Sequence, residues 1–434
     1  MFDSQAGSEP LDFTVEKLGA CEVPSPYVTE KYVDDKRRVL FHGDPGDLKP
    51  FFDAGLEPPA MEAAGPRQKI FFDPAGLKCG ILTCGGLCPG INDVIRSTVL
   101  SLYHHYGVTE VYGFINGYEG LAPHYGHEPL RLTPGGVADI NRLGGTILGS
   151  SRGPQDVGGM VDTLERMGID ILFTIGGDGT LKGAGAISGE IRRRGLRKAV
   201  IGIPKTIDND ISYIDRSFGF FTAGAEARKA VIAAHNEARG YRNGVALVKL
   251  MGREAGFIAA YAAITASEVN FCLIPEIPFT VEAFLEALKD RLRNRGHAVV
   301  LIAEGAGRNI MAGEEERDAS GNVRYGDVGI VLRDKIKQYF SDAGMELNLK
   351  YIDPSYTIRS VLAEADDSGF CLLLGFQAVH AAMSGRTNMV VGHWRNQFTH
   401  VPIPLAVSRR KKVEEHGWVW QNVLALTGQP RSMV

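Results

Sequence analysis

The chain alternates between short apolar runs, glycine-containing turns and amphipathic segments. In its first half the apolar runs are CGILTC (79–84), VYGFI (111–115), IDILFTI (169–175) and AVIGI (199–203). Between these runs, apolar residues recur at helical spacing, as at Ile91, Ile95, Val99 and Leu102, and at Met160, Leu164 and Met167. Strands that alternate with helices predict a parallel sheet with helices on both faces.

The second half repeats this pattern. It predicts strands within VALVKL (245–250), HAVVLIAEGAG (297–307) and ELNLKYIDPSY (346–356), and helices at 328–340 and 366–385. The predicted fold class is therefore α/β, with two doubly wound, Rossmann-like lobes facing a cleft.

The first 75 residues differ from the rest of the chain. They contain PSP, DDKRR, EPPA and GPR and show little periodicity. We expect residues 1–75 to form an N-terminal extension that packs on the main body.

Composition excludes several classes of function. The 434 residues carry a formal net charge of −4, which provides no basic field for nucleic acid. The longest apolar runs are too short to span a bilayer, and MFDSQAGSEP lacks the cationic and apolar parts of a secretory signal. We therefore expect a cytoplasmic protein that binds neither nucleic acid nor membrane. The cluster Cys79, Cys84 and Cys88 has neither CxxC spacing nor an interleaved histidine, so buried small residues are favoured over a metal site.

Two glycine-rich turns that follow predicted strands are candidates for anion binding. In GGLCPGIN (85–92), the glycine pair frees backbone N–H groups for an anion, although a tight strand–helix turn needs glycine in any case. In SSRGP (150–154), which follows a predicted short strand TILG (146–149), Arg152 can hold a phosphate or stack on a base. A solvated turn arginine is the alternative there.

The stretch IGGDGT (175–180) is more specific. Its glycines, Gly176, Gly177 and Gly179, let the backbone approach a polyphosphate. Asp178 would repel phosphate unless Mg²⁺ lies between them, and Mg²⁺ in proteins is bound by one or two carboxylates plus phosphate oxygens. The stretch therefore predicts a nucleotide or polyphosphate site with Mg²⁺ on Asp178, and the alternative is an ordinary turn with a capping aspartate.

The stretch PKTIDND (204–210) supplies candidate catalytic groups. Asp208 can take the proton of an attacking hydroxyl, and Asp210 can support a metal or orient the loop. Thr206 can bind a phosphate oxygen, while Lys205 can neutralise the charge on a transferred group. An N-capping loop with a surface lysine is the alternative.

Three motifs of the second half carry groups suited to a sugar phosphate. MGRE (251–254) follows a predicted strand and is expected to open a helix, which places Arg253 within reach of a phosphate. EGAG (304–307) ends a strand with Glu304, a partner for sugar hydroxyls. DPSYTIRS (353–360) brings Tyr356 and Arg359 three residues apart, which suits a phosphate clamp.

Taken together, these motifs resemble those of the 6-phosphofructokinases. GGLCPGIN, GSSRGP, GGDGT, PKTIDND, MGRE, AEGAG and PSYxIRS occur in the order of that family, and the resemblance covers roughly residues 75–400. GGDGT alone is shared with NAD kinases and lipid kinases. The extension and the wording of the motifs look most like the long ATP-dependent enzymes of plants and trypanosomatids, which are related to pyrophosphate-dependent phosphofructokinases.

The resemblance implies a set of roles. The phosphoryl donor is expected to contact Gly86, Arg152, Gly153, Gly177, Asp178, Gly179 and Thr180, with Mg²⁺ bound by Asp178. Fructose 6-phosphate is expected to contact Thr206, Ile207, Asp208, Met251, Gly252, Arg253, Glu304, Tyr356 and Arg359. The expected catalytic residues are Asp208, as the proton acceptor, with Lys205 and Arg253.

The resemblance also implies the domains and the assembly. A donor lobe is expected over 76–217, completed by about 357–395, and a sugar-phosphate lobe over 218–356, completed by about 396–434. A homo-oligomer, a tetramer or a dimer, is expected. The adjacent-subunit arginine of short bacterial enzymes has no clean match, and Arg242 is the nearest candidate.

The choice of donor depends on two positions. Pyrophosphate users of the family tend to carry aspartate at position 179, where it fills the space of the ATP α-phosphate, and lysine at position 205. Here the two positions hold Gly179 and Lys205. Because a steric block is harder to evade than an extra cation, glycine favours ATP, and the predicted reaction is phosphorylation of fructose 6-phosphate at O1 by MgATP.

Three alternatives remain open at this point. The first is a reversible, pyrophosphate-dependent enzyme of the same fold. The others are a NAD- or lipid-type kinase, which the sugar-phosphate motifs disfavour, and a non-catalytic sugar-phosphate-binding subunit, which Asp178 and Asp208 disfavour.

Overall fold

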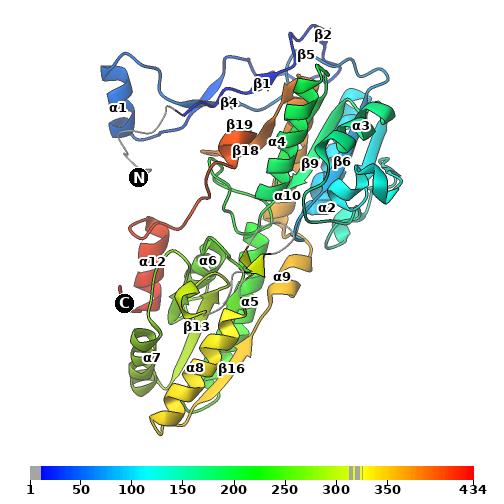
Figure 1. The fold of residues 1–434 in the computed structure, drawn as a ribbon. Coiled ribbons are helices and arrows are strands. Elements are labelled where there is room, and N and C mark those ends of the chain that lie inside the picture. Colours follow the sequence, from blue (N-terminus) through cyan, green and yellow to red (C-terminus); the bar gives the residue numbers. More distant parts are fainter. Residues whose placement is uncertain (1–10, 312–315, 318–322, 325) are drawn as a thin grey trace. The chain divides into compact units, whose positions relative to one another are not determined.

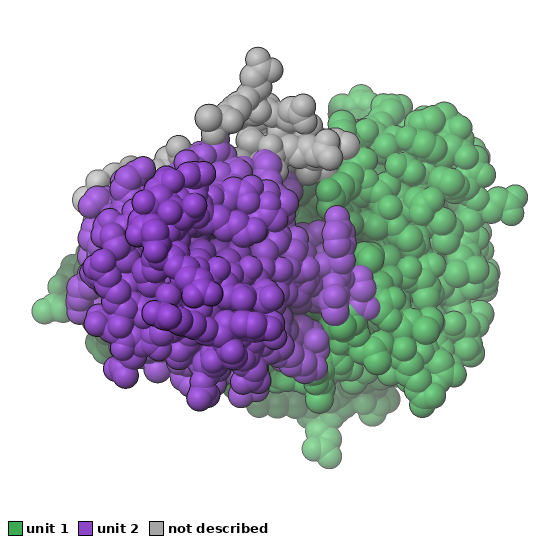
Figure 2. All heavy atoms as spheres, turned by 90° about the horizontal axis from the view of Figure 1, so that it is seen from below, with its two compact units in different colours: residues 1–206, 211–219, 361–409 green, residues 207–210, 220–360, 410–434 purple. Residues whose placement is uncertain are grey.

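The computed structural model describes residues 11–311, 316–317, 323–324 and 326–434. Its chain divides into two compact units, coloured separately in Figure 2. Unit 1 comprises 1–206, 211–219 and 361–409, and unit 2 comprises 207–210, 220–360 and 410–434.

Unit 1 is built on a nine-stranded sheet (Figure 1). In spatial order its strands are β3 (Arg38–Leu40), β4 (Ala60–Ala63), β19 (Gln397–Pro402), β18 (Met389–Trp394), β10 (Ala199–Pro204), β9 (Ile171–Gly176), β6 (Lys78–Thr83), β7 (Glu110–Phe114) and β8 (Leu130–Arg131). The five from β18 to β7 are parallel, and the flanking strands are antiparallel. The central strands are buried along their whole length, as parallel strands covered on both faces must be.

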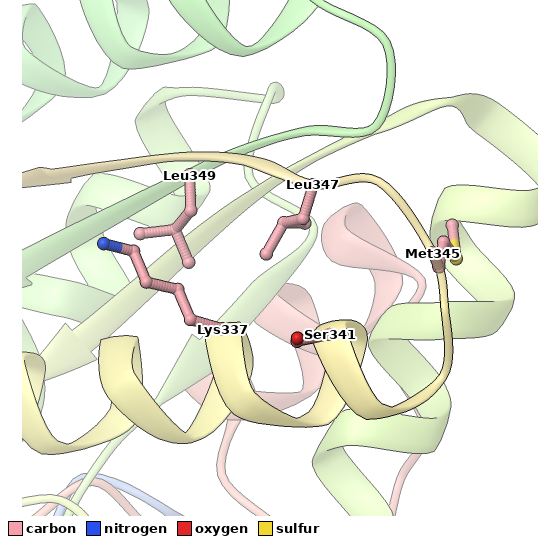
Figure 3. A pocket seen from close by; sticks show the side chains of 5 residues that line it. All are labelled: Lys337, Ser341, Met345, Leu347 and Leu349. Atoms are coloured by element: carbon pink, nitrogen blue, oxygen red, sulfur yellow. The ribbon is translucent and has the colours of Figure 1, made fainter.

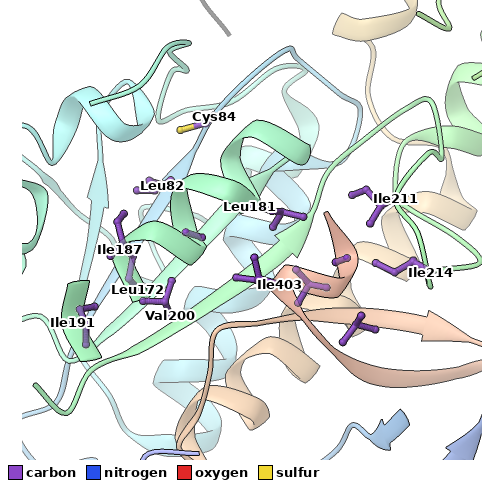
Figure 4. Close-up of a cluster of buried hydrophobic side chains, with 14 of the residues drawn as sticks. Leu82, Cys84, Leu172, Leu181, Ile187, Ile191, Val200, Ile211, Ile214 and Ile403 are labelled. Carbon is purple, nitrogen blue, oxygen red and sulfur yellow. The ribbon is translucent and has the colours of Figure 1, made fainter. Parts of the chain in front are cut away.

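Helices cover both faces of this sheet. The helices of unit 1 are α1 (Pro45–Asp53), α2 (Ile91–Tyr106), α3 (Val157–Met167), α4 (Asp178–Arg193), α10 (Ala365–Met383) and α11 (Ile403–Ala406). Because side chains alternate along a strand, Leu172 and Val200 meet α4 on one face (Figure 4), whereas α10 packs on β10 and α2 on the other.

The described part of the N-terminal extension belongs to unit 1. Besides β3 and β4, it contributes β1 (Glu16–Lys17), which pairs with β17 (Arg386–Thr387), and the pair β2 (Val23–Pro24) and β5 (Lys69–Ile70). β4 pairs with β19, so two strands of the extension form the edge of the main sheet.

Unit 2 contains a four-stranded parallel sheet. Its order is β12 (Phe271–Leu273), β13 (His297–Ala303), β11 (Gly244–Leu250) and β16 (Asn348–Ile352). Its helices are α5 (Phe220–Arg239), α6 (Phe257–Thr265), α7 (Val281–Arg295), α8 (Val328–Asp342), α9 (Ser355–Ser360) and α12 (Trp418–Thr427). α5 and α6 pack on this sheet and on each other, as do α7 and α8. A short antiparallel pair, β14 (Glu316–Arg317) and β15 (Val323–Arg324), stands apart from this sheet.

Both units are therefore doubly wound, which confirms the predicted α/β class. The chain passes between the units after residues 206, 210, 219, 360 and 409. It leaves unit 1 for the last time after Arg409, rather than at about 396, because β19 pairs with β18 and β4 in unit 1. No helix of the described residues is both long and apolar enough to traverse a bilayer.

One predicted strand is wrong. TILG (146–149) forms a turn, because its backbone oxygens bond to a neighbouring loop and to a side chain rather than to the backbone of an adjacent strand. Leu148 O accepts a bond from Asn116 N at 2.7 Å, and Gly149 O accepts one from Thr83 Oγ1 at 2.5 Å.

Candidate active site

Unit 1 gathers the predicted donor-binding loops at the carboxyl edge of its sheet. β6, β9 and β10 are parallel neighbours, so the loops that follow them start at one edge. The loop after β6 is tied to the SSRGP loop, since Gly85 N donates to Ser151 O at 3.1 Å and Ser150 Oγ donates to Gly85 O at 2.6 Å.

Lys205, Gly86 and Arg152 converge at this edge. Lys205 Nζ donates to Gly86 O at 2.7 Å, and a Cβ placed on Gly86 would lie 3.5 Å from Arg152 Nη2. Lys205 is only 6% exposed, so the alternative of a surface lysine is wrong. Arg152 is exposed, and Gly153 follows it with φ of +101°, a left-handed backbone that suits glycine.

The GGDGT stretch joins β9 to α4 at the same edge. Gly177 directly precedes α4, and a Cβ there would lie 3.3 Å from Lys205 O, so the two loops touch along their backbones. The side chain of Thr180 lies against Gly176, and its carbonyl accepts a bond from Tyr118 Oη at 2.6 Å. Thr180 is buried, so its hydroxyl is less accessible than its sequence position suggests.

Gly179 differs from the other glycines of this stretch. It lies in the first turn of α4, it is exposed, and a Cβ built on it meets nothing within 4 Å. The protein itself therefore leaves room for a side chain at position 179, and a side chain there would extend into open space.

Asp178 is the first residue of α4, where the helix dipole favours anions. Its Oδ2 lies 2.9 Å from Lys182 Nζ, and its side chain is 23% exposed. Among the described residues, no group of three or more His, Cys, Asp or Glu side chains is arranged so that it could hold a metal ion. An accessible single carboxylate at a helix N-terminus fits Mg²⁺ that is shared with phosphate oxygens, rather than a metal held by protein ligands alone.

Asp208 lies in unit 2 and has a perturbed pKa. The residue is half-buried, but its Oδ1 is buried. Burial raises its pKa to about 7, the Asp210 charge adds to this rise, and Arg359 opposes it. A carboxyl group whose pKa lies near neutrality is suited to act as a general base.

Asp210 is held by the chain that re-enters unit 2. Arg410 Nη1 lies 3.4 Å from its Oδ2, and Lys411 N donates to its backbone oxygen at 2.8 Å. Sequence reasoning missed Arg410, whose only signal was the basic run RRKK at 409–412.

The MGRE and EGAG motifs meet at the carboxyl ends of β11 and β13. Arg253 Nη2 lies 3.5 Å from Glu304 Oε1, and Gly305 N donates to Gly252 O at 3.0 Å. Gly252 has φ of +121°, and a Cβ there would lie 2.6 Å from Ala255 O, so this position requires glycine.

MGRE does not open a helix, contrary to the prediction. α6 begins only at Phe257, and Gly256 N donates to Glu276 Oε1 at 3.0 Å just before it. Arg253 therefore projects from a loop that is pinned between strands rather than from a first helical turn.

The last motif forms α9. Arg359 Nε lies 3.2 Å from the sulfur of the buried Met251, so α9 reaches the MGRE loop. Tyr356 is 81% exposed and lies three positions earlier on the same helix, a spacing that places both side chains on one face. Ile207, the remaining predicted contact, is buried in unit 2, while Thr206 ends the preceding stretch of unit 1.

The amino edge of the unit 2 sheet, opposite to the edge that carries Arg253 and Glu304, has a different character. A cavity of about 240 Å³ lies beside the start of β16 (Figure 3) and is lined by Lys337, Ser341, Met345, Leu347 and Leu349. Arg242 is exposed just before β11, at this amino edge. Within unit 2, neither the cavity nor Arg242 lies at the strand ends that carry Arg253 and Glu304.

Comparison with known proteins identifies the family. The Phosphofructokinase family profile matches residues 78–382. The chain is 47% identical to "ATP-dependent 6-phosphofructokinase" of Borreliella burgdorferi, over 98% of each chain. It is 43% identical to the protein of that name from Trypanosoma cruzi, over 96% of this chain and 87% of the relative. A crystal structure of a pyrophosphate-dependent phosphofructokinase from Marinobacter aquaeolei shares the fold, with a TM-score of 0.68 and 22% identity over 81% of this chain and 91% of the other. The chain belongs to the phosphofructokinase family.

Proposed function

We propose that this protein is an enzyme that phosphorylates D-fructose 6-phosphate at O1 with MgATP, giving fructose 1,6-bisphosphate and ADP in glycolysis. The relatives named above as ATP-dependent support this activity. The observation that carries the choice of donor is Gly179, where an added Cβ would meet no protein atom within 4 Å, so this position holds no blocking side chain.

The donor is held mainly by the carboxyl-edge loops of unit 1. Backbone N–H groups of the loops at Gly86 and Gly177 face the phosphates, and Arg152 and Lys205 neutralise their charge. Asp178 would hold Mg²⁺, which when bound supplies positive charge to the β- and γ-phosphate oxygens. Catalysis then depends on positioning and charge neutralisation for in-line transfer.

The acceptor is held by the charged side chains of unit 2. Arg253, Arg359 and Tyr356 contact the 6-phosphate and its surroundings, and Glu304 accepts from a sugar hydroxyl. Asp208 accepts the proton of the 1-hydroxyl as O1 attacks, a role that its raised pKa supports. We further propose a cytoplasmic homo-oligomer, a tetramer or a dimer, in which Arg242 is the candidate contribution of a neighbouring subunit.

The test is a comparison of initial rates with fructose 6-phosphate and Mg²⁺, using ATP or pyrophosphate as donor. We expect strong activity with ATP and none with pyrophosphate. Activity with pyrophosphate alone would establish the rival activity, which the cation Lys205 favours, and would overturn the role given to Gly179. Activity with neither donor would overturn the enzymatic proposal.

A further inference from the structure

The N-terminal extension is joined to the rest of unit 1 by ion pairs with the buried Arg386. Arg386 is fully buried and contacts the carboxylate of Glu62, and its Nη2 donates to Asp35 Oδ1 at 2.6 Å. Arg67 Nε donates to the same Asp35 oxygen at 2.7 Å. Buried arginines are costly unless paired, so losing the extension's carboxylates would leave the Arg386 charge without these partners.

The extension also contributes two aromatic side chains to one cluster. Phe13 and Phe41 lie 5.5 Å apart between ring centroids, and both contact the ring of Tyr213, at 5.5 and 5.7 Å. Trp394 stacks on Phe41 at 5.0 Å and donates from Nε1 to the backbone oxygen of Phe41 at 3.0 Å. All four side chains are buried, with exposures of 4–7%.

Of the four aromatic residues in this cluster, Tyr213 is closest in sequence to Asp208, which it follows by five residues. Its backbone has φ of +63°, a left-handed conformation that is strained for a bulky residue and persists only where the surroundings over-determine it. The surroundings here are Phe13, Phe41 and the guanidinium of Arg409, which lies 5.1 Å from the ring centroid of Tyr213.

The ends of this segment are closed within unit 1. Ser217 Oγ donates to Thr206 O at 2.6 Å, and Lys205 forms a β-bridge with Phe218. Asp215 N donates to His393 O at 2.9 Å. The stretch from Lys205 to Phe218 is thus a closed loop whose returning arm is held by the aromatic cluster.

We propose that Phe13 and Phe41 are positioning residues for the transfer reaction: they hold Tyr213 in its strained conformation and thereby fix the position of Asp208 on the loop that begins at Lys205. The extension then supports the active site, although neither Phe13 nor Phe41 contacts the substrate. This inference rests on the proposed function, in which Asp208 is the base.

The first test replaces Phe41 by leucine and compares it with Phe72→Leu. Phe72 is a similarly buried aromatic of the extension, at 8% exposure, and is no part of this cluster. Both variants lose ring contacts and are expected to melt at lower temperature than wild type. Only Phe41→Leu is expected to lose kcat, by about tenfold to 10²-fold, because sub-ångström to 1 Å displacements of a catalytic group have effects of that size.

A double-mutant cycle separates positioning from general loosening. If Phe41 acts through Asp208, then Phe41→Leu in an Asp208→Asn background adds less than about threefold, because the base is already lost. Losses that multiply would overturn the proposal. A kcat of Phe41→Leu within twofold of wild type, at a temperature where the variant is folded, would overturn it as well.

A second variant tests the tyrosine itself. Tyr213→Phe keeps the ring and is expected to retain kcat, whereas Tyr213→Leu is expected to lose it as Phe41→Leu does. Equal kcat values for the two variants would contradict the proposed role of the Tyr213 ring in positioning the loop. Failure of the proposed function is distinguishable from these outcomes, because the wild-type protein would then show no phosphorylation of fructose 6-phosphate at all.

Discussion

The two units present different chemistry at the carboxyl edges of their sheets. In unit 1, the predicted donor residues are mostly glycines, and their contacts run through backbone, as between Gly177 and Lys205 O. In unit 2, half of the predicted acceptor residues have charged side chains, such as Arg253 and Glu304, whose loops are joined by the bond from Gly305 N to Gly252 O. A glycine-lined site is altered by adding a side chain, whereas a site of charged groups is altered by removing one.

The largest expected effect comes from neutralising the base of unit 2. Asp208→Asn should lower kcat by roughly 10²–10⁴-fold, the usual contribution of a general base. Steady-state rates with ATP would measure this loss, with circular dichroism as the control for folding. A variant with near-normal turnover would remove Asp208 from the mechanism.

The next effect comes from adding a side chain in unit 1. Gly179→Asp should lower kcat/KM for ATP on the order of 10²-fold, since a carboxylate against phosphate has a like-charge penalty of several kcal/mol. Thermal stability should change little, because a Cβ at this position meets nothing within 4 Å. Gly179→Ala is the matched control, with a small effect. If both donors are used by Gly179→Asp as by wild type, position 179 does not select the donor.

The pH dependence should follow the carboxyl of unit 2. Since Asp208 has a pKa of about 7 and must be ionised to act, kcat/KM should fall about tenfold per pH unit below that value. Asp208→Asn should lack this limb, and it is the necessary control because phosphate groups also titrate near pH 6. A wild-type limb that persists in Asp208→Asn would assign it to the substrates.

The same raised pKa predicts that folding stability falls as pH rises, whereas kcat/KM rises. The folded protein binds the Asp208 proton more tightly than the unfolded chain, so ionisation costs stability as pH rises from about 4 to about 7. At pH 8, Asp208→Asn should therefore melt at a higher temperature than wild type. The difference should shrink at pH 5, and a constant difference would point to another cause.

The smallest expected effect concerns Lys182, whose Nζ lies 2.9 Å from Asp178 Oδ2. An exposed pair of this spacing contributes about 0.3–0.5 kcal/mol. Lys182→Met should remove this cation from Asp178 and lower the Mg²⁺ concentration for half-maximal rate by about twofold, with Lys182→Arg as control. A large rise in the Mg²⁺ requirement would show instead that Lys182 itself binds the donor.

Much of the architecture followed from local apolar runs. IDILFTI and AVIGI were predicted as strands because they are continuous, bounded by glycine and short, and they form β9 and β10. The errors came where local signals were ambiguous. TILG contains strand-forming residues, but its backbone oxygens accept bonds from a neighbouring loop and a side chain instead of from the backbone of an adjacent strand. The glycine of MGRE lies in a loop, and the helix begins only at Phe257.

The candidate site was harder to predict beyond its motifs. That Lys205 is buried against Gly86 depends on two loops that are distant in sequence, as does the pairing of Arg410 with Asp210. Nothing local in VLFHG (39–43) indicates that Phe41 meets Tyr213. Such contacts arise only when sheet order is known, and here the hairpin of β18 and β19 that brings them together was not predicted.

The order β3-β4-β19-β18-β10 also determines how long β4 must wait for its partner strand during translation. β4 reaches the central strands only through β19, which begins at Gln397. At 5–20 residues per second, a ribosome needs on the order of 20–70 s to pass from one to the other. Throughout that interval the first strands of the nascent chain await their partner, so a chaperone that binds near the N-terminus would find its longest opportunity there.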